Sequence, residues 1–311
     1  MLRIVIPDDD PPVMLPSKAY AKLAQHDVRT YSDRPSGPGD LIDRIRDADV
    51  VINIRSTSRF TDEVLEACPN LRLISIWGTG TDNVDLAASK ARGICVTNTP
   101  GVAAIAVAEH TLALIFAIAK QLVQVDQQVR RGKWPRAMVT QLRGKTLGLI
   151  GTGAIGREVA KLGRGAGMRV IAWTFRPAGD IAVWVPLEEV FRQSDVVSVH
   201  VRYSSETAGL IGRELFDLMK PGAIFINTAR GTIVKEADLL DALQTNRIAG
   251  AGLDVFEEEP LPQDSRFFSL PNVLLTPHAA GITPETTETG LAFSIDNVFS
   301  FLAGQPMNVV L

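Results

Sequence analysis

The chain has 311 residues, 46% of them hydrophobic and 22% charged, which is the balance of a folded globular protein long enough for two domains. Its 32 basic and 35 acidic residues leave a formal net charge of −3 without a long run of either sign, so neither a nucleic-acid surface nor an anionic-membrane surface is indicated. Two cysteines, Cys68 and Cys95, fit a reducing compartment, and the first apolar segment is too short for a targeting signal, so we expect a cytoplasmic protein.

Short apolar segments alternate with helical stretches through the N-terminal third of the chain, a pattern typical of an α/β domain. Arg55 and Ser56 follow the third expected strand, and the glycine-rich loop that contains Thr79 and Gly80 follows the fourth. Loops beyond the carboxyl ends of parallel strands are where such sheets bind ligands. The residues alone leave open either an anion site or ordinary turn glycines beside a solvated arginine. The strands expected in this third are Arg3–Ile6, Val28–Tyr31, Asp49–Ile54, Leu71–Ile76 and Ile94–Val96.

The stretch from Val102 to Val125 is apolar enough to raise the question of a membrane span. Glu109, His110 and Lys120 interrupt it, and ionisable groups are costly in hydrocarbon, so we expect a long helix buried against protein. A helix that is apolar on nearly every side must be covered on nearly every side, and a second subunit is one candidate for part of that cover.

The most informative motif follows a buried strand, Thr146–Ile150, which runs directly into a Gly-x-Gly-x-x-Gly turn. A helical stretch from Ile155 to Leu162 and a second strand, Met168–Trp173, complete a β-α-β unit of the expected size. This context favours a dinucleotide site over a loop that is merely tight.

Each glycine of the turn has a predicted role. Gly151 permits the tight bend, Gly153 lets a pyrophosphate approach the backbone, and Gly156 lets the helix lie close to the strand. The helix start, at Ala154 and Ile155, offers free N–H groups and a partial positive charge to the phosphates.

The rest of the chain completes the predicted architecture. A last helix, from about Glu285 to Leu302, has no strand after it, so we expect it to pack on the first domain. The predicted fold is α/β with two doubly wound parallel sheets: a flavodoxin-like substrate domain of residues 1–99 and 285–311, and a Rossmann-type cofactor domain of residues 100–284. Four further strands, which bring the cofactor sheet to six, are expected at Asp195–Val201, Ala223–Asn227, Ala251–Val255 and Val273–Thr276.

Three polar residues, Arg230, Glu259 and His278, lie just past three of these strands. Histidine titrates close enough to neutral pH to give and take a proton, and a neighbouring carboxylate holds its ring and favours the imidazolium. An arginine binds a substrate carboxylate with two parallel hydrogen bonds. Their shared location predicts a site that transfers a proton while a cofactor transfers the hydride. Taken singly, Glu259 also fits a solvated acidic run, and His278 also fits an ordinary loop.

The end of the second strand of the β-α-β unit bears on which cofactor is used. An NAD-selective site places an acid there to bind the ribose hydroxyls, but this chain has no acid until Asp180. Thr174 and Arg176 stand in that region, and Arg202 follows the next strand of the sheet. A guanidinium binds phosphate in a two-pronged geometry, so we expect NAD(P)(H) with a modest preference for NADP(H). The alternative is a solvated Arg176 and an enzyme that tolerates both cofactors.

Several motifs in a fixed order resemble the D-2-hydroxyacid dehydrogenase family, which includes 3-phosphoglycerate dehydrogenases and glyoxylate/hydroxypyruvate reductases. The resemblance runs through most of the chain. The motifs that carry it are Gly78-Thr79-Gly80-Thr81-Asp82-Asn83-Val84-Asp85, Val96-Thr97-Asn98-Thr99-Pro100-Gly101, Ala108-Glu109-His110-Thr111, Gly144-Lys145-Thr146-Leu147-Gly148, Asn227-Thr228-Ala229-Arg230-Gly231, Leu253-Asp254-Val255-Phe256-Glu257-Glu258-Glu259-Pro260 and Thr276-Pro277-His278.

The resemblance implies a role for each candidate residue. Arg230 would orient the 2-oxo acid, with His278 as the acid/base and Glu259 as its partner. It further implies a cleft between two α/β domains and a homodimer formed through the helix that contains Glu109. No metal site is expected. The substrate carboxylate would meet Thr79 and Gly80, with Arg55 and Ser56 nearby, and the cofactor would meet the glycine turn, Thr228, Ala229, Asp254 and Gly281. His26, His110 and His200 match no catalytic role and are interpreted as structural.

Two other functions fit the same frame. Formate dehydrogenases resemble this family but carry glutamine where Glu259 stands, which argues against formate, whereas phosphite dehydrogenases keep all three polar residues. A dinucleotide-sensing interaction protein, like the corepressors that share this fold, is the alternative from another class. Which small 2-oxo or 2-hydroxy acid is used is left open by the sequence.

Overall fold

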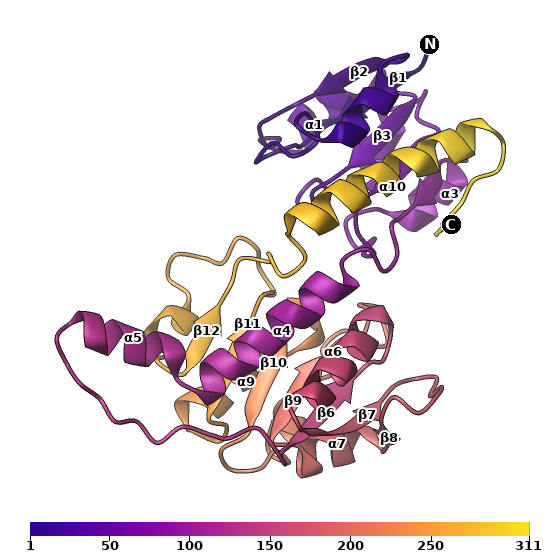
Figure 1. The fold of residues 1–311 in the computed structure, drawn as a ribbon. Helices are drawn as coiled ribbons and strands as arrows, with labels where there is room; N and C mark the ends of the chain where they lie inside the picture. Colours follow the sequence, from indigo (N-terminus) through magenta and orange to yellow (C-terminus); the bar gives the residue numbers. More distant parts are fainter. Residues whose placement is uncertain (311) are drawn as a thin grey trace. The chain divides into compact units, whose positions relative to one another are not determined.

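The computed structural model describes residues 1–310 and divides the chain into two compact units (Figure 1). The first unit comprises Met1–Ala103 and the segment from Ile282 onward, and the second comprises Ala104–Gly281. These boundaries lie within four residues of the expected ones, which were 99/100 and 284/285. Each unit is built around its own parallel sheet.

The first unit has a five-stranded sheet in the order β2-β1-β3-β4-β5, with every neighbouring pair parallel. This is the flavodoxin-like order, in which the winding direction reverses between β1 and β3. The strands are β1 (Arg3–Ile6), β2 (Asp27–Thr30), β3 (Val50–Asn53), β4 (Leu73–Ile76) and β5 (Cys95–Thr97). The helices are η1 (Lys18–Leu23), α1 (Pro38–Ile45), α2 (Asp62–Glu66), α3 (Leu86–Ala91) and α10 (Pro284–Leu302).

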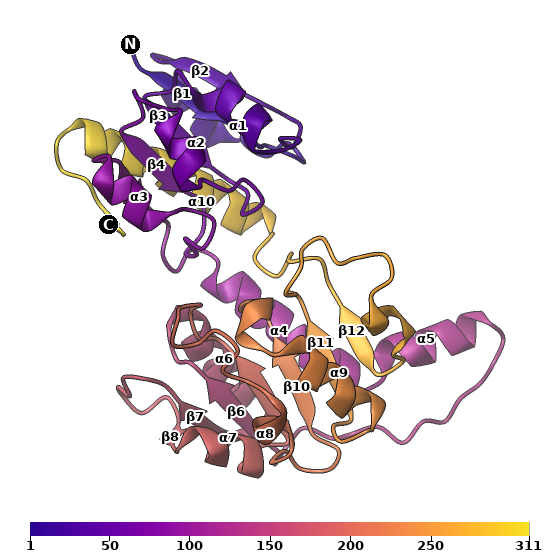
Figure 2. The same ribbon diagram turned by 180° about the vertical axis from the view of Figure 1, so that it is seen from behind.

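Helix α10 covers one face of this first sheet although it comes from the far end of the sequence (Figure 2). Its buried side chains Leu291, Ile295 and Val298 pack in one cluster with residues of β1, β3 and β4. The Ser75 hydroxyl in β4 donates a hydrogen bond to the Ser294 carbonyl at 2.8 Å. The first unit is therefore made from two separate stretches of the chain.

The second unit has a seven-stranded parallel sheet in the order β12-β11-β10-β9-β6-β7-β8, a Rossmann-type order that reverses between β6 and β9. The sequence predicted six of these strands, with ends within two residues of those observed, and missed β8, which spans only Val183–Trp184. The strands are β6 (Thr146–Ile150), β7 (Arg169–Trp173), β8, β9 (Val196–Val199), β10 (Ile224–Asn227), β11 (Gly250–Leu253) and β12 (Val273–Leu275). The helices are α4 (Ala104–Ala119), α5 (Leu122–Arg130), α6 (Ala154–Gly165), α7 (Leu187–Gln193), α8 (Arg213–Phe216), η2 (Gly231–Ile233), α9 (Glu236–Gln244) and η3 (Arg266–Ser269).

The central strands of the second sheet are apolar on both faces, as the continuous hydrophobic runs predict. In β10, Phe225 packs into a cluster on one face, while Ile224 and Ile226 pack on the other face with α4 and α6. Both faces are buried, so loops at the strand ends are the parts of this sheet that reach solvent.

The apolar stretch from residue 102 to 125 forms two helices instead of the single long helix that was expected. Gln121 has φ +51°, a left-handed conformation, and α4 and α5 meet there at a bend of 59°. No single helix among residues 1–310 is long and apolar enough to cross a membrane, although the bent pair passes the length and composition test. Helix α4 is a core helix that packs against α6, β10 and β11, whereas α5 buries none of its residues.

Candidate active site

The glycine turn connects β6 to α6, and two of its glycines are required by close backbone contacts. Gly151 has φ +97°, and a Cβ placed there would lie 2.6 Å from the backbone of His200 and Val201. A Cβ at Gly156 would lie 2.3 Å from the Gly151 carbonyl oxygen. Gly156 therefore allows the end of the turn to pack against the backbone at its start. The close approach of helix to strand rests on Gly163, where a Cβ would come within 2.5 Å of Leu147.

Gly153 stands at the N-terminus of α6 and leaves the approach to it open. No side chain caps this helix, and among the described residues no atom lies within 4 Å of where a Gly153 Cβ would be. The first N–H groups of α6, from Ala154 and Ile155 onward, thus face a space that a side chain at residue 153 would fill. This arrangement fits the diphosphate of a dinucleotide.

Thr174 and Arg176 follow β7, the strand beside β6, and Arg202 follows β9 on the other side of β6. Parallel strands place these three residues at the same edge of the sheet as the glycine turn. Arg176 and Arg202 are exposed, and Phe175 packs on Trp173 with ring centroids 4.9 Å apart. The loop therefore offers a cation where an NAD-selective site has an acid.

His278 and Glu259 are in direct contact. The Nδ1 atom of His278 lies 2.7 Å from Oε2 of Glu259, and Oε1 of the same carboxylate accepts the Phe256 N–H at 2.9 Å. Burial acts to raise the pKa of Glu259, but the hydrogen bond and charge of His278, the Phe256 N–H and the charge of Arg230 together hold that pKa below its ordinary value. Glu259 is thus an ionised partner for the imidazole.

Arg230 follows β10, and its loop is tied down by Asn227. The Asn227 amide group donates to the Arg230 carbonyl at 2.9 Å, and its oxygen accepts the Ala229 N–H at 3.0 Å. A Cβ at Gly231 would lie 1.9 Å from the carbonyl carbon of Phe256, so the Arg230 loop packs directly on the backbone that leads to Glu259. Three candidates that lie far apart in the sequence therefore share one edge of the second sheet.

Asp254, which follows β11, organises the turn that carries His278. Its carboxylate is buried and accepts the Thr276 hydroxyl at 2.5 Å and the N–H groups of Ala279 and Ala280 at 2.9 Å each. Its own carbonyl accepts the His278 N–H at 2.7 Å. His278 has φ +52°, a conformation that non-glycine residues seldom adopt, and these contacts hold it there.

Thr228 and Gly281 are the remaining cofactor candidates of the second unit. Thr228 is buried, and its hydroxyl lies 3.0 Å from that of Thr111 in α4. Gly281 is half-buried. It directly follows Ala279 and Ala280, whose N–H groups bind the Asp254 carboxylate. Both therefore lie at the carboxyl edge of the sheet or next to it.

The substrate candidates Arg55, Ser56, Thr79 and Gly80 all lie in the first unit, after β3 and β4. Arg55 is half-buried and donates to the Pro11 carbonyl at 2.6 Å, and burial lowers its pKa against the opposing charges of Asp9, Asp8 and Asp10. In the loop after β4, the Asn98 side-chain amide donates to the Thr79 carbonyl at 2.9 Å. Thr79 is otherwise exposed to solvent.

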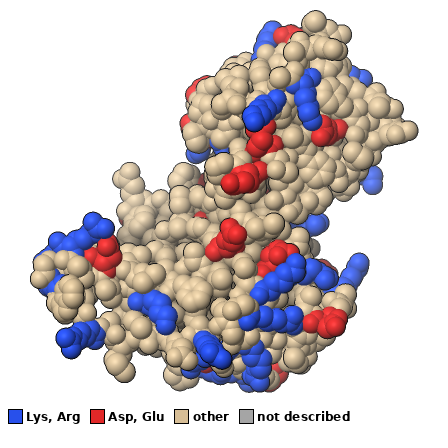
Figure 3. Space-filling model, in the orientation of Figure 1, with Lys and Arg blue, Asp and Glu red and all other residues tan. Residues whose placement is uncertain are grey.

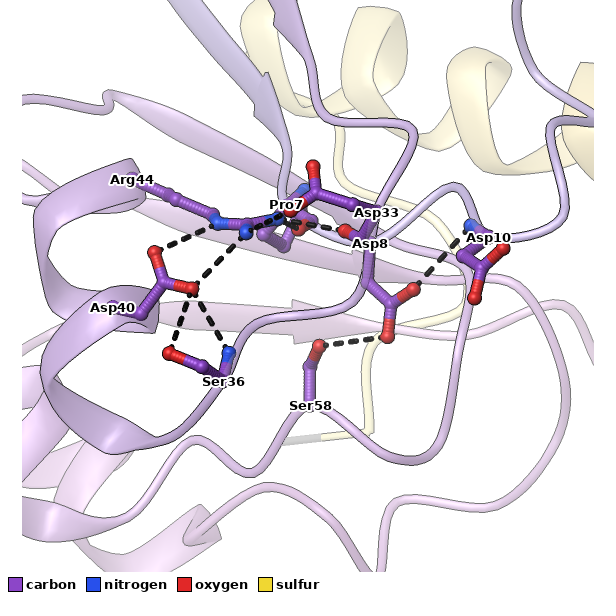
Figure 4. A network of polar contacts seen from close by, with 8 residues as sticks. All are labelled: Pro7, Asp8, Asp10, Asp33, Ser36, Asp40, Arg44 and Ser58. Carbon is purple, nitrogen blue, oxygen red and sulfur yellow. Dashed lines mark hydrogen bonds and ion pairs between the residues drawn. The ribbon is translucent and has the colours of Figure 1, made fainter.

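A polar network that the sequence did not reveal supports these first-unit loops (Figure 4). Asp8 is buried and accepts the hydroxyl of Thr57 at 2.9 Å and that of Ser58 at 3.4 Å, so it ties the loop after β1 to the loop after β3. Arg44 in α1 donates to the Pro7 carbonyl at 2.9 Å and to the Asp33 carboxylate at 2.7 Å. The network spans the point where the winding of this sheet reverses.

The histidines that were interpreted as structural behave differently from one another. Nε2 of His200 is hydrogen-bonded to the Ser198 hydroxyl at 2.9 Å beneath the glycine turn. Burial lowers the pKa of His200 to about 3, so this histidine is neutral near pH 7. His26 packs on Phe299, with ring centroids 6.1 Å apart. His110 is different, because its ring contacts Thr276 in the Asp254 turn. No spacing in the sequence connects residues 110 and 276.

The chain is similar to known proteins over most of its length. The family described as D-isomer specific 2-hydroxyacid dehydrogenase, NAD binding domain, matches residues 112–280. A glyoxylate reductase of Korarchaeum cryptofilum is 38% identical in an alignment of 310 positions, and the alignment covers 95% of this chain and 93% of that protein. An acyclic imino acid reductase solved with NADPH and D-arginine has a TM-score of 0.92 at 33% identity over the full length of both chains. D-Lactate dehydrogenase from Aquifex aeolicus, solved with NAD and lactic acid, has a TM-score of 0.89 at 30% identity and covers 99% of this chain and 98% of that one.

Proposed function

The chain belongs to the D-isomer specific 2-hydroxyacid dehydrogenase family, and we propose that Arg230, Glu259 and His278 are its catalytic residues. The protein is an NAD(P)-dependent oxidoreductase that transfers a hydride between a nicotinamide cofactor and a small 2-oxo acid or D-2-hydroxy acid. The observation that carries the residue assignment is the 2.7 Å contact between His278 and the ionised Glu259, at the same sheet edge as Arg230.

His278 exchanges the proton that accompanies hydride transfer. Its Nδ1 is engaged by Glu259, so the proton passes through Nε2, from the imidazolium to the carbonyl oxygen in reduction and back from the hydroxyl in oxidation. Glu259 stabilises the protonated ring, because an ionised carboxylate beside an imidazole favours the charged form. The bound nicotinamide cofactor supplies or accepts the hydride.

Binding and orientation are assigned to the surrounding loops. Arg230 holds the substrate carboxylate through paired hydrogen bonds, and the N–H groups of Thr79 and Gly80, with Arg55 and Ser56, are also assigned to substrate binding. The backbone of Thr228 and Ala229, with Gly281, takes the nicotinamide end. Asp254 is proposed there as well, and its carboxylate accepts three hydrogen bonds from the turn that carries His278. We therefore also assign it to positioning His278.

A substrate panel tests the proposed activity. We expect the purified chain to oxidise NADH or NADPH in the presence of glyoxylate or hydroxypyruvate, measured as loss of absorbance of the reduced cofactor, because relatives named glyoxylate reductase and glycerate dehydrogenase are 38% identical to it. 3-Phosphohydroxypyruvate, phosphite with oxidised cofactor, and a 2-oxo acid with ammonium complete the panel. Dinucleotide binding without turnover on any of these would favour the sensing protein instead.

We further propose that the enzyme prefers NADP(H) modestly. The support is the exposed Arg176 after β7 with no acid before Asp180, and Figure 3 shows basic side chains gathered over the α6 and β7 region. Arg176→Ala is expected to lower kcat/KM for NADPH by roughly tenfold and to leave NADH nearly unchanged, because one charge-assisted phosphate contact is lost. Arg29→Ala, an exposed arginine in the first unit, is the control. A strong NADH preference that Arg176→Ala leaves intact would contradict the assignment.

The proposed assembly is a cytoplasmic homodimer formed through α4 and α5. Helix α5 buries none of its residues, and the segment around it exposes Leu122, Val129 and Trp134. Exposed apolar groups gathered on one projecting segment are typical of a surface that another chain covers. Sedimentation of the intact chain at micromolar concentration would contradict this assembly if only the monomer were found.

A further inference from the structure

His110 in α4 reaches the turn that carries His278. Its Nε2 lies 3.0 Å from the Thr276 hydroxyl oxygen and 3.8 Å from Oδ1 of Asp254. All of these residues belong to the second unit. The ring therefore connects a core helix to the loop after β12.

The hydrogen bonds fix the direction of donation along this chain of contacts. The Asp254 carboxylate accepts hydrogen bonds from three donors, the Thr276 hydroxyl and two backbone N–H groups. Thr276 has one hydroxyl hydrogen, and it points to Asp254. The Thr276 oxygen must then accept from His110, so the His110 ring carries its hydrogen on Nε2.

The far end of the chain of contacts is the backbone of His278. Asp254 holds Ala279 and Ala280 through its carboxylate and the His278 N–H through its carbonyl. These bonds keep His278 at φ +52°, the conformation from which its Nδ1 meets Glu259. If the His110 side chain is replaced by one that cannot donate a hydrogen bond, the Thr276 hydroxyl is free to rotate away from the buried Asp254 carboxylate.

We propose that His110 is a positioning residue: its Nε2–H fixes the Thr276 hydroxyl on Asp254 and thereby holds the left-handed turn that presents His278 to Glu259. The inference rests on the proposed function only in taking His278 as the acid/base. His110 takes no part in the proton transfer itself, but its loss is expected to lower the turnover that His278 supports.

Two substitutions at residue 110 separate the donor from the ring. His110→Leu removes the donor at similar volume and is expected to lower kcat for the best 2-oxo acid by roughly 10-fold to 100-fold, because small misplacements of a catalytic group cost up to about 10²-fold in rate. His110→Gln places an amide N–H near the position of Nε2 and is expected to recover most of that loss. Dinucleotide affinity, measured by fluorescence titration, and the thermal midpoint are expected to stay near wild type. His26→Leu, a histidine of the first unit, is the matched control with unchanged turnover.

A double-mutant cycle with Thr276→Val gives a second measurement that does not depend on any single variant. Because both side chains act through Asp254, the effect of the double variant on kcat is expected to fall well short of the product of the single effects. The proposal would be overturned if His110→Leu kept the wild-type kcat, or if His110→Gln lost as much kcat as His110→Leu. It would also be overturned if the effects of residues 110 and 276 on kcat were independent. Those results leave the proposed function standing provided that wild type turns over and His278→Ala does not, whereas failure of that pair would count against the function itself.

Discussion

Replacing His278 with alanine is expected to lower turnover with a 2-oxo acid by roughly 10²-fold to 10⁴-fold, the range for loss of a general acid/base. The alanine variant keeps the glycine turn and α6, so its affinity for the dinucleotide is expected to stay close to that of wild type. Steady-state kinetics and a fluorescence titration measure the two quantities in one preparation. Near-normal turnover would show that another group moves the proton.

Glu259→Gln serves as the companion to the His278 variant. Glutamine preserves a hydrogen-bonding group beside Nδ1 but removes the negative charge that favours the imidazolium. Since reduction needs the protonated ring, the high-pH limb of its rate is expected to move to lower pH in this variant. An unchanged pH profile would mean that the 2.7 Å contact contributes geometry alone.

Gly231→Ala is expected to lower the free energy of unfolding by about 3 kcal/mol, the upper end of the usual cost of overpacking. The new Cβ would lie 1.9 Å and 2.1 Å from the carbonyl carbon and oxygen of Phe256 and 2.4 Å from the Glu257 nitrogen. These are backbone atoms that no rotamer change can move aside. Because Arg230 precedes this glycine and Phe256 donates to Glu259, turnover should fall along with the thermal midpoint.

Gly165→Ala is the matched control for this prediction. Gly165 ends α6, and among the described residues no atom lies within 4 Å of its added Cβ. Alanine there is expected to raise the free energy of unfolding by about 0.4–1 kcal/mol, so it does not destabilise the protein. If both variants unfolded at the wild-type temperature, the tight packing of the Arg230 loop would not be a constraint on the protein.

The apolar segments were sufficient to predict two parallel sheets and eleven of their twelve strands. Strands such as Thr146–Ile150 and Arg3–Ile6 lie where the sequence placed them, because a strand buried on both faces is a short apolar run with turn residues at each end. The strand Val183–Trp184 was missed because two residues are too few to show a hydrophobic pattern. The break at Gln121 was missed because a left-handed residue inside an apolar run leaves no signal when it is not glycine.

For the site, the sequence located polar residues at strand ends but not their partners. The contact between His278 and Glu259 was expected because both follow strands of one parallel sheet. The contact between His110 and Thr276 joins residues 166 positions apart, one in a helix and one in a loop, so no local pattern encodes it. The buried carboxylate of Asp8 shows the same limit, because nothing in the local sequence indicates that it accepts the hydroxyls of Thr57 and Ser58.

The two-segment construction of the first unit has a consequence for synthesis. The second unit, Ala104–Gly281, is continuous, so all of its strands are present once residue 281 has left the ribosome. The first sheet is translated earlier, yet Leu291, Ile295 and Val298 of α10, which cover Ile4 and Ile52, come last. The part of the chain that emerges first must therefore wait with an uncovered apolar face, and the domain that begins second is the first that can close its core.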